Sequence, residues 1–184
     1  MPGIGQSGAS PAPSPESLGV IISMPPDLAE ELGQWRETFA GSGAGAVPAH
    51  ITLVSGRAKG SWAEAAEHVR AIAREASPFI ISLRGTGTFA PVSDVVFLKL
   101  DAGVEECVDL HSRLLDGPLE HLVEFGFHPH LTIAHDLDQP AMERAETALA
   151  DFGAKLEVSS IGLYDYSHGG WALREELPLG GGLS

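Results

Sequence analysis

The chain is poor in cysteine, in positive charge and in long apolar runs, and these absences exclude several classes of protein. A single cysteine, Cys107, excludes an intrachain disulfide and a zinc site built from several cysteines. The 11 Lys and Arg residues are scattered among 25 Asp and Glu residues, which gives a formal charge of −14. Duplex DNA would be repelled, because such binding needs clustered cations that displace counterions. A small phosphate ligand in a local pocket is compatible with this charge.

The sequence also lacks signals for membranes and secretion. No apolar run approaches the roughly 20 residues of a membrane helix, so no membrane partner is expected. The first sixteen residues contain no Lys or Arg and therefore no positive region of a signal peptide. We expect a cytoplasmic protein that is a monomer. With 184 residues, 43% of them apolar, the chain suits one domain with a real core.

Alternating and helical patterns of apolar residues follow one another between residues 18 and 177. They predict strands over residues 18–24, 50–54, 79–83, 95–100, 130–134, 155–164 and 171–177. They predict helices over residues 25–39, 62–73, 104–115 and 140–152. Ser61 with Glu64 fits a capping box at the start of the second helix. Residues 1–16, rich in Pro, Gly and Ser, are predicted to form a disordered tail.

The predicted elements repeat at a nearly constant offset. Strands begin at residues 18 and 95, strand histidines stand at 50 and 130, and the following helices begin near residues 62 and 140. We infer an internal duplication, in which residues 17–180 form a single domain of two lobes around a pseudo-two-fold axis. A cleft on that axis would receive one histidine from each lobe.

Both of these histidines stand in the motif His-apolar-Thr-apolar. The two segments are VPAHITL at residues 47–53 and FHPHLTI at residues 127–133. With eight His and six Thr in the chain, His-x-Thr is expected by chance about 0.26 times. It occurs twice, at matching points of the repeat. A lone strand His is usually structural and a lone Thr is an ordinary strand former, but the pairing favours a functional role.

The spacing of the motif has a physical meaning. Residues two apart on a strand share a face, so His50 with Thr52, and His130 with Thr132, would face one cavity while the apolar residues pack behind them. Two imidazoles with pKa values near 6.5 suit acid–base phosphoryl chemistry. The neutral ring removes a proton from the attacking oxygen, and the protonated ring gives one to the leaving oxygen. Threonine hydroxyls can donate to the phosphate oxygens, and no metal or other cofactor is required.

The duplicated motif resembles the 2H phosphoesterase superfamily, which includes bacterial 2′-5′ RNA ligases and 2′,3′-cyclic phosphodiesterases. PAHITL and FHPHLTIA are similar to the two signature strands of that family. FIISLRGTGTF followed by VVFLKL resembles its central hairpin, and GLYDYSHGGWALREELPLG resembles its closing strands. The resemblance implies a bilobal α+β fold, with two antiparallel sheets lining a central cleft and helices outside.

The resemblance also implies the chemistry. His50 and His130 would be the acid–base pair, with Thr52 and Thr132 holding the phosphate. A 2′,3′-cyclic phosphate of a nucleotide or RNA end would open to a 2′-phosphate, with His50 as the acid and His130 as the base. The roles swap in the ligating direction. Many relatives carry Arg shortly after the second Thr, where this chain has Ala134, and this departure favours small cyclic phosphates over long RNA.

Further side chains are candidates for binding the substrate. Arg57 and Arg84 are the cations expected near the phosphate, with a solvated surface position as the alternative. Four aromatic residues could either stack on a nucleobase or belong to the core: Phe89, Tyr164, Tyr166 and Trp171.

The remaining histidines have other interpretations. His128, His130 and His135 could form a metal cluster with Asp136, but this alternative leaves His50 unexplained. We expect His111, on an apolar helix stripe, to be buried or at the edge of the cleft. Three histidines are predicted to lie on the surface: His68, His121 and His168.

Three functions follow from the sequence. The first is a metal-independent phosphodiesterase that opens small cyclic phosphates. The second is reversible 2′-5′ joining of RNA ends. The third is a non-catalytic protein that binds nucleotides or RNA ends, against which the two intact motifs argue.

Overall fold

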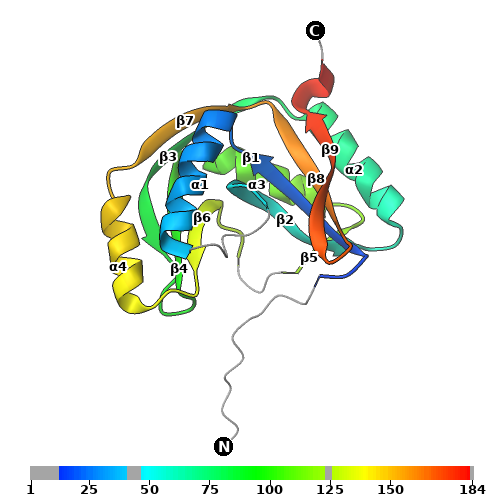
Figure 1. Cartoon of the computed structure of the whole chain (residues 1–184). Helices are drawn as coiled ribbons and strands as arrows, with labels where there is room; N and C mark the ends of the chain where they lie inside the picture. The colour runs from blue at the N-terminus through cyan, green and yellow to red at the C-terminus, as the bar shows by residue number, and fades with distance from the viewer. Residues whose placement is uncertain (1–12, 41–46, 123–125, 183–184) are drawn as a thin grey trace, which may run out of the picture.

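The computed structural model describes residues 13–40, 47–122 and 126–182. Nine strands and five helices lie in these ranges (Figure 1): β1 (Ser17–Ser23), α1 (Pro26–Ala40), β2 (His50–Ala58), α2 (Trp62–Glu75), β3 (Phe79–Thr88), β4 (Val95–Ala102), α3 (Val104–Leu115), β5 (Leu119–His121), β6 (His130–His135), α4 (Gln139–Ala148), β7 (Gly153–Val158), β8 (Ser160–Ser167), β9 (Gly170–Pro178) and the 3₁₀ helix η2 (Leu179–Gly182). None of the helices in these ranges is both long enough and apolar enough to cross a bilayer.

The strands form one antiparallel sheet, which confirms the expected α+β class. Its order is β7-β3-β4-β6-β2-β1-β8-β9, and β5 pairs with β2. The two sheets expected from the resemblance are two halves of this sheet, because β2 and β6 join at a single residue pair, Ile51 with Leu131. The strands that carry the motifs therefore lie side by side at the centre, each with three further strands beyond it.

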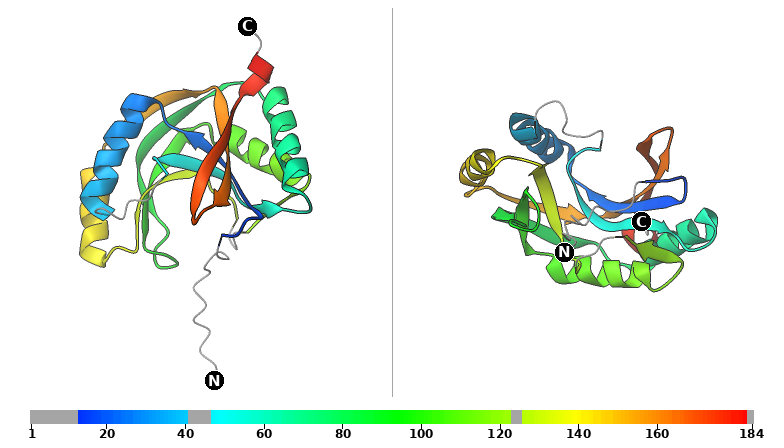
Figure 2. Two further views of the ribbon diagram at one scale, coloured as in Figure 1. Left: turned by 45° about the vertical axis from the view of Figure 1, so that its right-hand side comes forward. Right: turned by 90° about the horizontal axis from the view of Figure 1, so that it is seen from below.

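The four α-helices lie in two pairs outside the sheet (Figures 1 and 2). α1 lies beside α4, and α2 lies beside α3. Phe39 of α1 packs against a buried cluster of Val96, Met142 and Ala145, which ties α1 and α4 to β4. α3 packs on β2, and α1 packs on β6, so each motif strand is supported from behind by a helix.

Two of the helix starts follow their sequence signals. The Ser61 hydroxyl accepts a hydrogen bond from the Glu64 N–H at 3.1 Å, which confirms the predicted cap of α2. The Asp138 carboxylate caps α4 in the same way by accepting from the Ala141 N–H at 2.8 Å.

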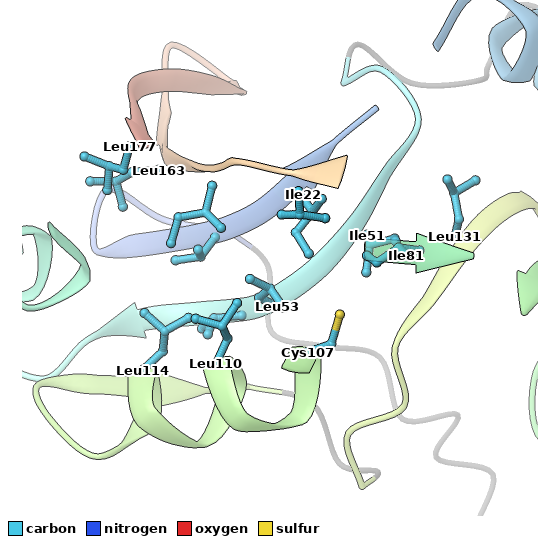
Figure 3. Packing of buried hydrophobic residues seen from close by; sticks show 14 of the residues in the cluster. Ile22, Ile51, Leu53, Ile81, Cys107, Leu110, Leu114, Leu131, Leu163 and Leu177 are labelled. Atoms are coloured by element: carbon cyan, nitrogen blue, oxygen red, sulfur yellow. The ribbon is translucent and has the colours of Figure 1, made fainter. Parts of the chain in front are cut away.

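The core lies between the sheet and its helices and is continuous across both halves (Figure 3). Leu53 of β2 packs near Cys107, Leu110 and Leu114 of α3, and all four are buried. Burial raises the pKa of the Cys107 thiol to about 12, with the charge of Glu106 adding to the effect, so this cysteine is a packing residue.

The strand prediction over residues 155–164 is wrong. The segment is two strands, β7 and β8, separated at Ser159. β7 pairs with β3 in one half of the sheet, whereas β8 pairs with β1 in the other half. A residue pattern indicates which face of a strand is buried but not which strand it pairs with. The passage of the chain from one half of the sheet to the other at Ser159 could therefore not be predicted.

Two further differences concern short segments. β5 was not predicted, because three residues are too few to show a pattern. Residues 1–12 of the predicted tail over residues 1–16 lie outside the described residues, and residues 13–16 are described. Residues 15–16 form a turn, and the Glu16 carbonyl accepts a hydrogen bond from the Ala58 N–H at 3.1 Å.

Candidate active site

The two His-x-Thr motifs alternate in exposure as their spacing predicted. In β2, His50 and Thr52 are partly exposed while the intervening Ile51 is fully buried. In β6, His130 and its threonine are partly exposed around a fully buried Leu131. Each strand thus presents an imidazole and a hydroxyl on one face. Apolar residues of the same strands, among them Ile51, Leu53 and Leu131, lie in the core (Figure 3).

The register of β2 and β6 brings the motifs together. Ile51 pairs with Leu131 in antiparallel orientation. In antiparallel orientation the positions one step to either side of this pair are His50 with Thr132 and Thr52 with His130, and Thr52 shares one pocket with each of the two histidines. Two imidazoles and two hydroxyls therefore surround one point of the sheet.

Each imidazole is held by the same local hydrogen bond. Nδ1 of His50 lies 2.8 Å from the carbonyl oxygen of Pro48, and Nδ1 of His130 lies 2.6 Å from that of His128. A carbonyl oxygen can only accept, so Nδ1 carries the proton in both rings. In the neutral rings Nε2 therefore has the free lone pair, and Nε2 is the atom available for proton transfer.

Burial lowers the pKa of both histidines. For His50, the bond to Pro48 opposes this effect and the charge of Arg36 adds to it. For His130, the bond to His128 opposes it, and the charges of His128 and His50 lower the pKa further. Since the charge of His50 acts on His130, the two rings are within electrostatic reach of each other. Both rings are mainly neutral at pH 7 in the absence of a ligand.

Two neighbouring pockets open beside the motifs, and both are lined by Thr52 and Ser55. The larger pocket, of about 410 Å³, has this lining: Thr52, Ser55, Phe89, Val92, Ser93, His121, Gly126, Phe127, His128 and His130. The smaller pocket, of about 180 Å³, has this lining: Gly19, Ile21, Val47, His50, Thr52, Val54, Ser55, Tyr164 and Trp171. Each pocket receives one of the two motif histidines.

The predicted aromatic residues divide between the pockets. Phe89 lies in the larger one, with its ring centroid 5.0 Å from that of His130 and the two rings nearly perpendicular. Tyr164 and Trp171 line the smaller one. Tyr166 packs against Trp171 with centroids 5.5 Å apart and lines neither pocket. Thr132 stands on the face of the motifs but is not in contact with either pocket.

The two predicted phosphate-binding arginines lie away from these pockets. Arg57 forms an exposed ion pair with Glu120 at 2.9 Å. Arg84 is exposed on β3, where it pairs with Gly153 of β7. Neither lines the larger or the smaller pocket. Arg57 follows the first motif strand directly, but its side chain is directed to Glu120 instead of the pockets. For Arg84, the alternative of an exposed surface position agrees with its exposure.

Two residues near the site escaped sequence reasoning. Arg36 of α1 lowers the pKa of His50 through its charge and donates to the Val47 carbonyl at 3.1 Å. His121 was predicted to lie on the surface but is partly buried and lines the larger pocket. No local pattern marks either residue, since both reach the site through tertiary packing.

The remaining histidines line neither of the two pockets, apart from His128, and His111 supports the first motif strand from α3. His111 is buried, as predicted, and its Nδ1 donates to the Leu53 carbonyl at 2.6 Å. His68 was predicted to lie on the surface, but it is partly buried and its Nε2 lies 3.1 and 3.0 Å from the carbonyl oxygens of Arg113 and Leu114. His168 is exposed, as predicted.

The alternative metal cluster is not assembled. His135 is exposed and its Nδ1 lies 2.8 Å from the Asp136 carboxylate, whereas His128 and His130 line the larger pocket. In the described part of the chain, no three His, Cys, Asp or Glu side chains are grouped so that they could hold a metal ion.

Comparison with known proteins agrees with this arrangement. Residues 24–170 match the model of the 2′-5′ RNA ligase superfamily, and the chain belongs to that family. A Bacillus pumilus protein named "Putative phosphoesterase" is 30% identical over 168 residues, covering 88% of this chain and 96% of that protein. An Oceanobacillus iheyensis protein of the same description is 30% identical over 122 residues, covering 65% of this chain and 67% of that protein.

Solved structures share the fold. Escherichia coli LigT complexed with 3′-AMP superposes with a TM-score of 0.63 at 20% identity, covering 90% of this chain and 99% of that chain. TT0787 of Thermus thermophilus superposes with a TM-score of 0.61 at 20% identity, covering 91% of this chain and 100% of that chain. The resemblance inferred from the paired motifs is confirmed, and the family supports a phosphoesterase activity.

Proposed function

We propose that the protein is a phosphodiesterase that opens 2′,3′-cyclic phosphates of nucleotides or RNA ends to 2′-phosphates. The observation that carries this proposal is the pairing of β2 with β6, which sets two histidines on one face, each with Nδ1 engaged by a carbonyl. The free Nε2 atoms are thereby available for an acid and a base on one phosphorus centre.

The proposed reaction moves one proton to one imidazole and one proton from the other. The neutral imidazole takes a proton from water as the water oxygen bonds to phosphorus. The protonated imidazole gives its proton to the 3′ oxygen as the bond from phosphorus to that oxygen breaks. Following the family resemblance, His50 is the acid and His130 the base. Thr52 and Thr132 donate hydrogen bonds to the non-bridging oxygens as their negative charge grows.

Binding of the substrate would protonate one of the two imidazoles. Both imidazoles have lowered pKa values and are mainly neutral before binding. An anionic phosphate between them favours the charged form of one ring and raises its pKa. The substrate would therefore favour protonation of the imidazole that its own leaving oxygen needs as an acid.

The chain's charge of −14 favours small substrates over long RNA. The nucleotides 3′-AMP and ATP bound by LigT support a nucleotide ligand.

A product-resolved assay tests the proposal. The protein is incubated with nucleoside 2′,3′-cyclic phosphates, with and without EDTA, and the 2′- and 3′-phosphates are separated by chromatography. We expect only the 2′-phosphate, at a rate that EDTA does not change. Formation of the 3′-phosphate, or loss of turnover in EDTA, would contradict the mechanism.

Reversible 2′-5′ joining is the second candidate, because two pockets share Thr52 and could hold one group on each side of a phosphorus centre. The test combines an RNA with a 2′,3′-cyclic end and a partner with a 5′-hydroxyl. A 2′-5′ linkage supports joining, whereas hydrolysis alone rejects it. Tight binding of both RNAs without any turnover would instead support the non-catalytic alternative.

A further inference from the structure

His121 belongs to neither motif, yet it lines the larger pocket together with Thr52 and His130. It ends β5, the three-residue strand that pairs with β2, where it is the partner of Gly56. A side chain at Gly56 would collide with the backbone carbonyl of Glu120. Glycine at this position is therefore what allows β5, and with it His121, to approach the motif strand.

Hydrogen bonding fixes the tautomer of His121. The backbone N–H of Ser55 donates to Nδ1 of His121 at 3.2 Å. A backbone N–H can only donate, so Nδ1 holds the lone pair and the neutral ring carries its proton on Nε2. This is the reverse of the arrangement in His50 and His130, where Nδ1 carries the proton. His121 is thus unsuited to their role and offers a donor instead.

Neighbouring rings hold His121 in this position. His111 meets it edge to face, with centroids 4.8 Å apart, and stacks on Phe127 at 3.9 Å with the two rings nearly parallel. His111 is itself anchored through its bond to the Leu53 carbonyl. Burial lowers the pKa of His121, and the charge of His111 lowers it further, which keeps the ring neutral near pH 7.

The pocket around this donor suits a flat organic ring. Phe89, Val92 and Phe127 supply apolar walls, and His111 holds Phe127 in place by stacking on it. A volume of about 410 Å³ lies within the usual range for small-molecule sites. Within the described ranges, Nε2 of His121 has no hydrogen-bond partner in the protein.

We propose that His121 is a specificity-determining residue, whose Nε2–H donates to a ring acceptor of a nucleobase held in the larger pocket. The proposal rests on the function proposed above, and it adds the pocket that holds the base of the nucleotide and the side chain that recognises the base. A site built to donate to a ligand discriminates against ligands without an acceptor, because the donor is then left unpaired.

Two amide variants, each of which replaces one ring nitrogen of His121, separate this role from a structural one. In His121→Asn, the amide oxygen can replace Nδ1 as the acceptor for Ser55, but nothing replaces the donor at Nε2. In His121→Gln, the amide nitrogen reaches the position of Nε2 and keeps the donor. His168→Asn, at an exposed histidine, serves as the control.

Calorimetric binding of adenosine 2′-monophosphate and of inorganic phosphate provides the readout and requires no turnover. We expect His121→Asn to weaken nucleotide binding on the order of tenfold, the effect of one lost hydrogen bond, and to leave phosphate binding unchanged. His121→Gln and His168→Asn should bind both ligands as the wild type does.

The outcomes also separate this inference from the proposed function. Unchanged nucleotide binding in His121→Asn, or equal losses for nucleotide and phosphate, would overturn the role of His121 whether or not the wild type opens cyclic phosphates. If His121→Asn loses nucleotide binding but keeps phosphate binding, while the wild type shows no turnover, the binding role of His121 is supported and the proposed reaction is rejected.

Discussion

Ile51 and Leu131 pair across β2 and β6, and this one pair sets the phase of both His-x-Thr motifs. Both side chains are fully buried. Because the pairing is antiparallel, His50 and Thr132 follow it on one side and Thr52 and His130 on the other. A shift of one residue in either strand would turn its histidine into the core and its apolar residues into the pocket. The buried pair thus determines the geometry of the exposed groups.

Truncation of this pair should destabilise the fold. We expect Ile51→Ala to lower the free energy of unfolding by about 2–5 kcal/mol, through lost burial and the cavity that remains. Ile80→Ala, at an isoleucine with 51% of its surface exposed, is the matched control and should change stability by less than about 1 kcal/mol. Urea unfolding followed by circular dichroism measures both. Equal effects would show that the Ile51 site is not part of a packed core.

Loss of either motif histidine should abolish most of the activity. His50→Ala and His130→Ala should each lower kcat/KM by roughly 10²- to 10⁴-fold, the usual contribution of a general acid or base. His168→Ala should have no effect, because that residue is exposed and lines neither pocket. Initial rates on a nucleoside 2′,3′-cyclic phosphate provide the measurement. Full activity in either motif variant would rule out the two-histidine mechanism.

The leaving group can distinguish the acid from the base. If His50 protonates the leaving oxygen, His50→Ala should lose far less activity on a p-nitrophenyl phosphodiester, whose leaving group departs without a proton, than on the cyclic phosphate. His130→Ala should be impaired on both substrates, because the water still needs a base. The opposite pattern would exchange the two roles. Release of p-nitrophenolate is followed by its absorbance.

Two glycine substitutions, Gly56→Ala and the control Gly33→Ala, test whether β5 must lie close to β2. Gly56→Ala should destabilise the protein and weaken nucleotide binding, because the new Cβ meets the Glu120 carbonyl and displaces β5 with His121. Gly33→Ala in α1 has open space at that position and should stabilise the protein by up to about 1 kcal/mol through better helix propensity. Thermal unfolding of both variants checks the contrast. A neutral Gly56→Ala would mean that β5 can move without cost.

Stability should fall as the pH falls through the range in which unfolded histidines titrate. The pKa values of His50, His121 and His130 are lowered by burial in the folded state. The unfolded chain therefore binds more protons than the folded one below its histidine pKa of about 6.5, so the free energy of unfolding rises with pH across this window.

The urea midpoint measured between pH 5 and pH 8 tests this expectation. The wild type should lose stability below about pH 6.5, and the His50→Ala, His130→Ala double variant should lose less over the same range. An identical slope in the two proteins would show that these histidines do not titrate abnormally in the folded state.

The sequence predicted most of the elements and the central pair of the candidate site. Strand alternation reveals which residues share a face, and the recurrence of His-x-Thr at matching points indicated that the two faces meet. Arg57 shows the limit of such reasoning. It follows the first motif directly, but its guanidinium forms an ion pair with Glu120 of β5, a strand too short to be predicted.

What the sequence determined by itself is local: the period of each strand and the cap of α2. Tertiary structure alone decided the single contact between the two halves of the sheet, the crossing of β7 into β8, and the entry of His121 into the pocket. The physical reason is that side-chain periodicity depends on neighbouring residues, whereas strand partners are chosen by the burial of the whole core.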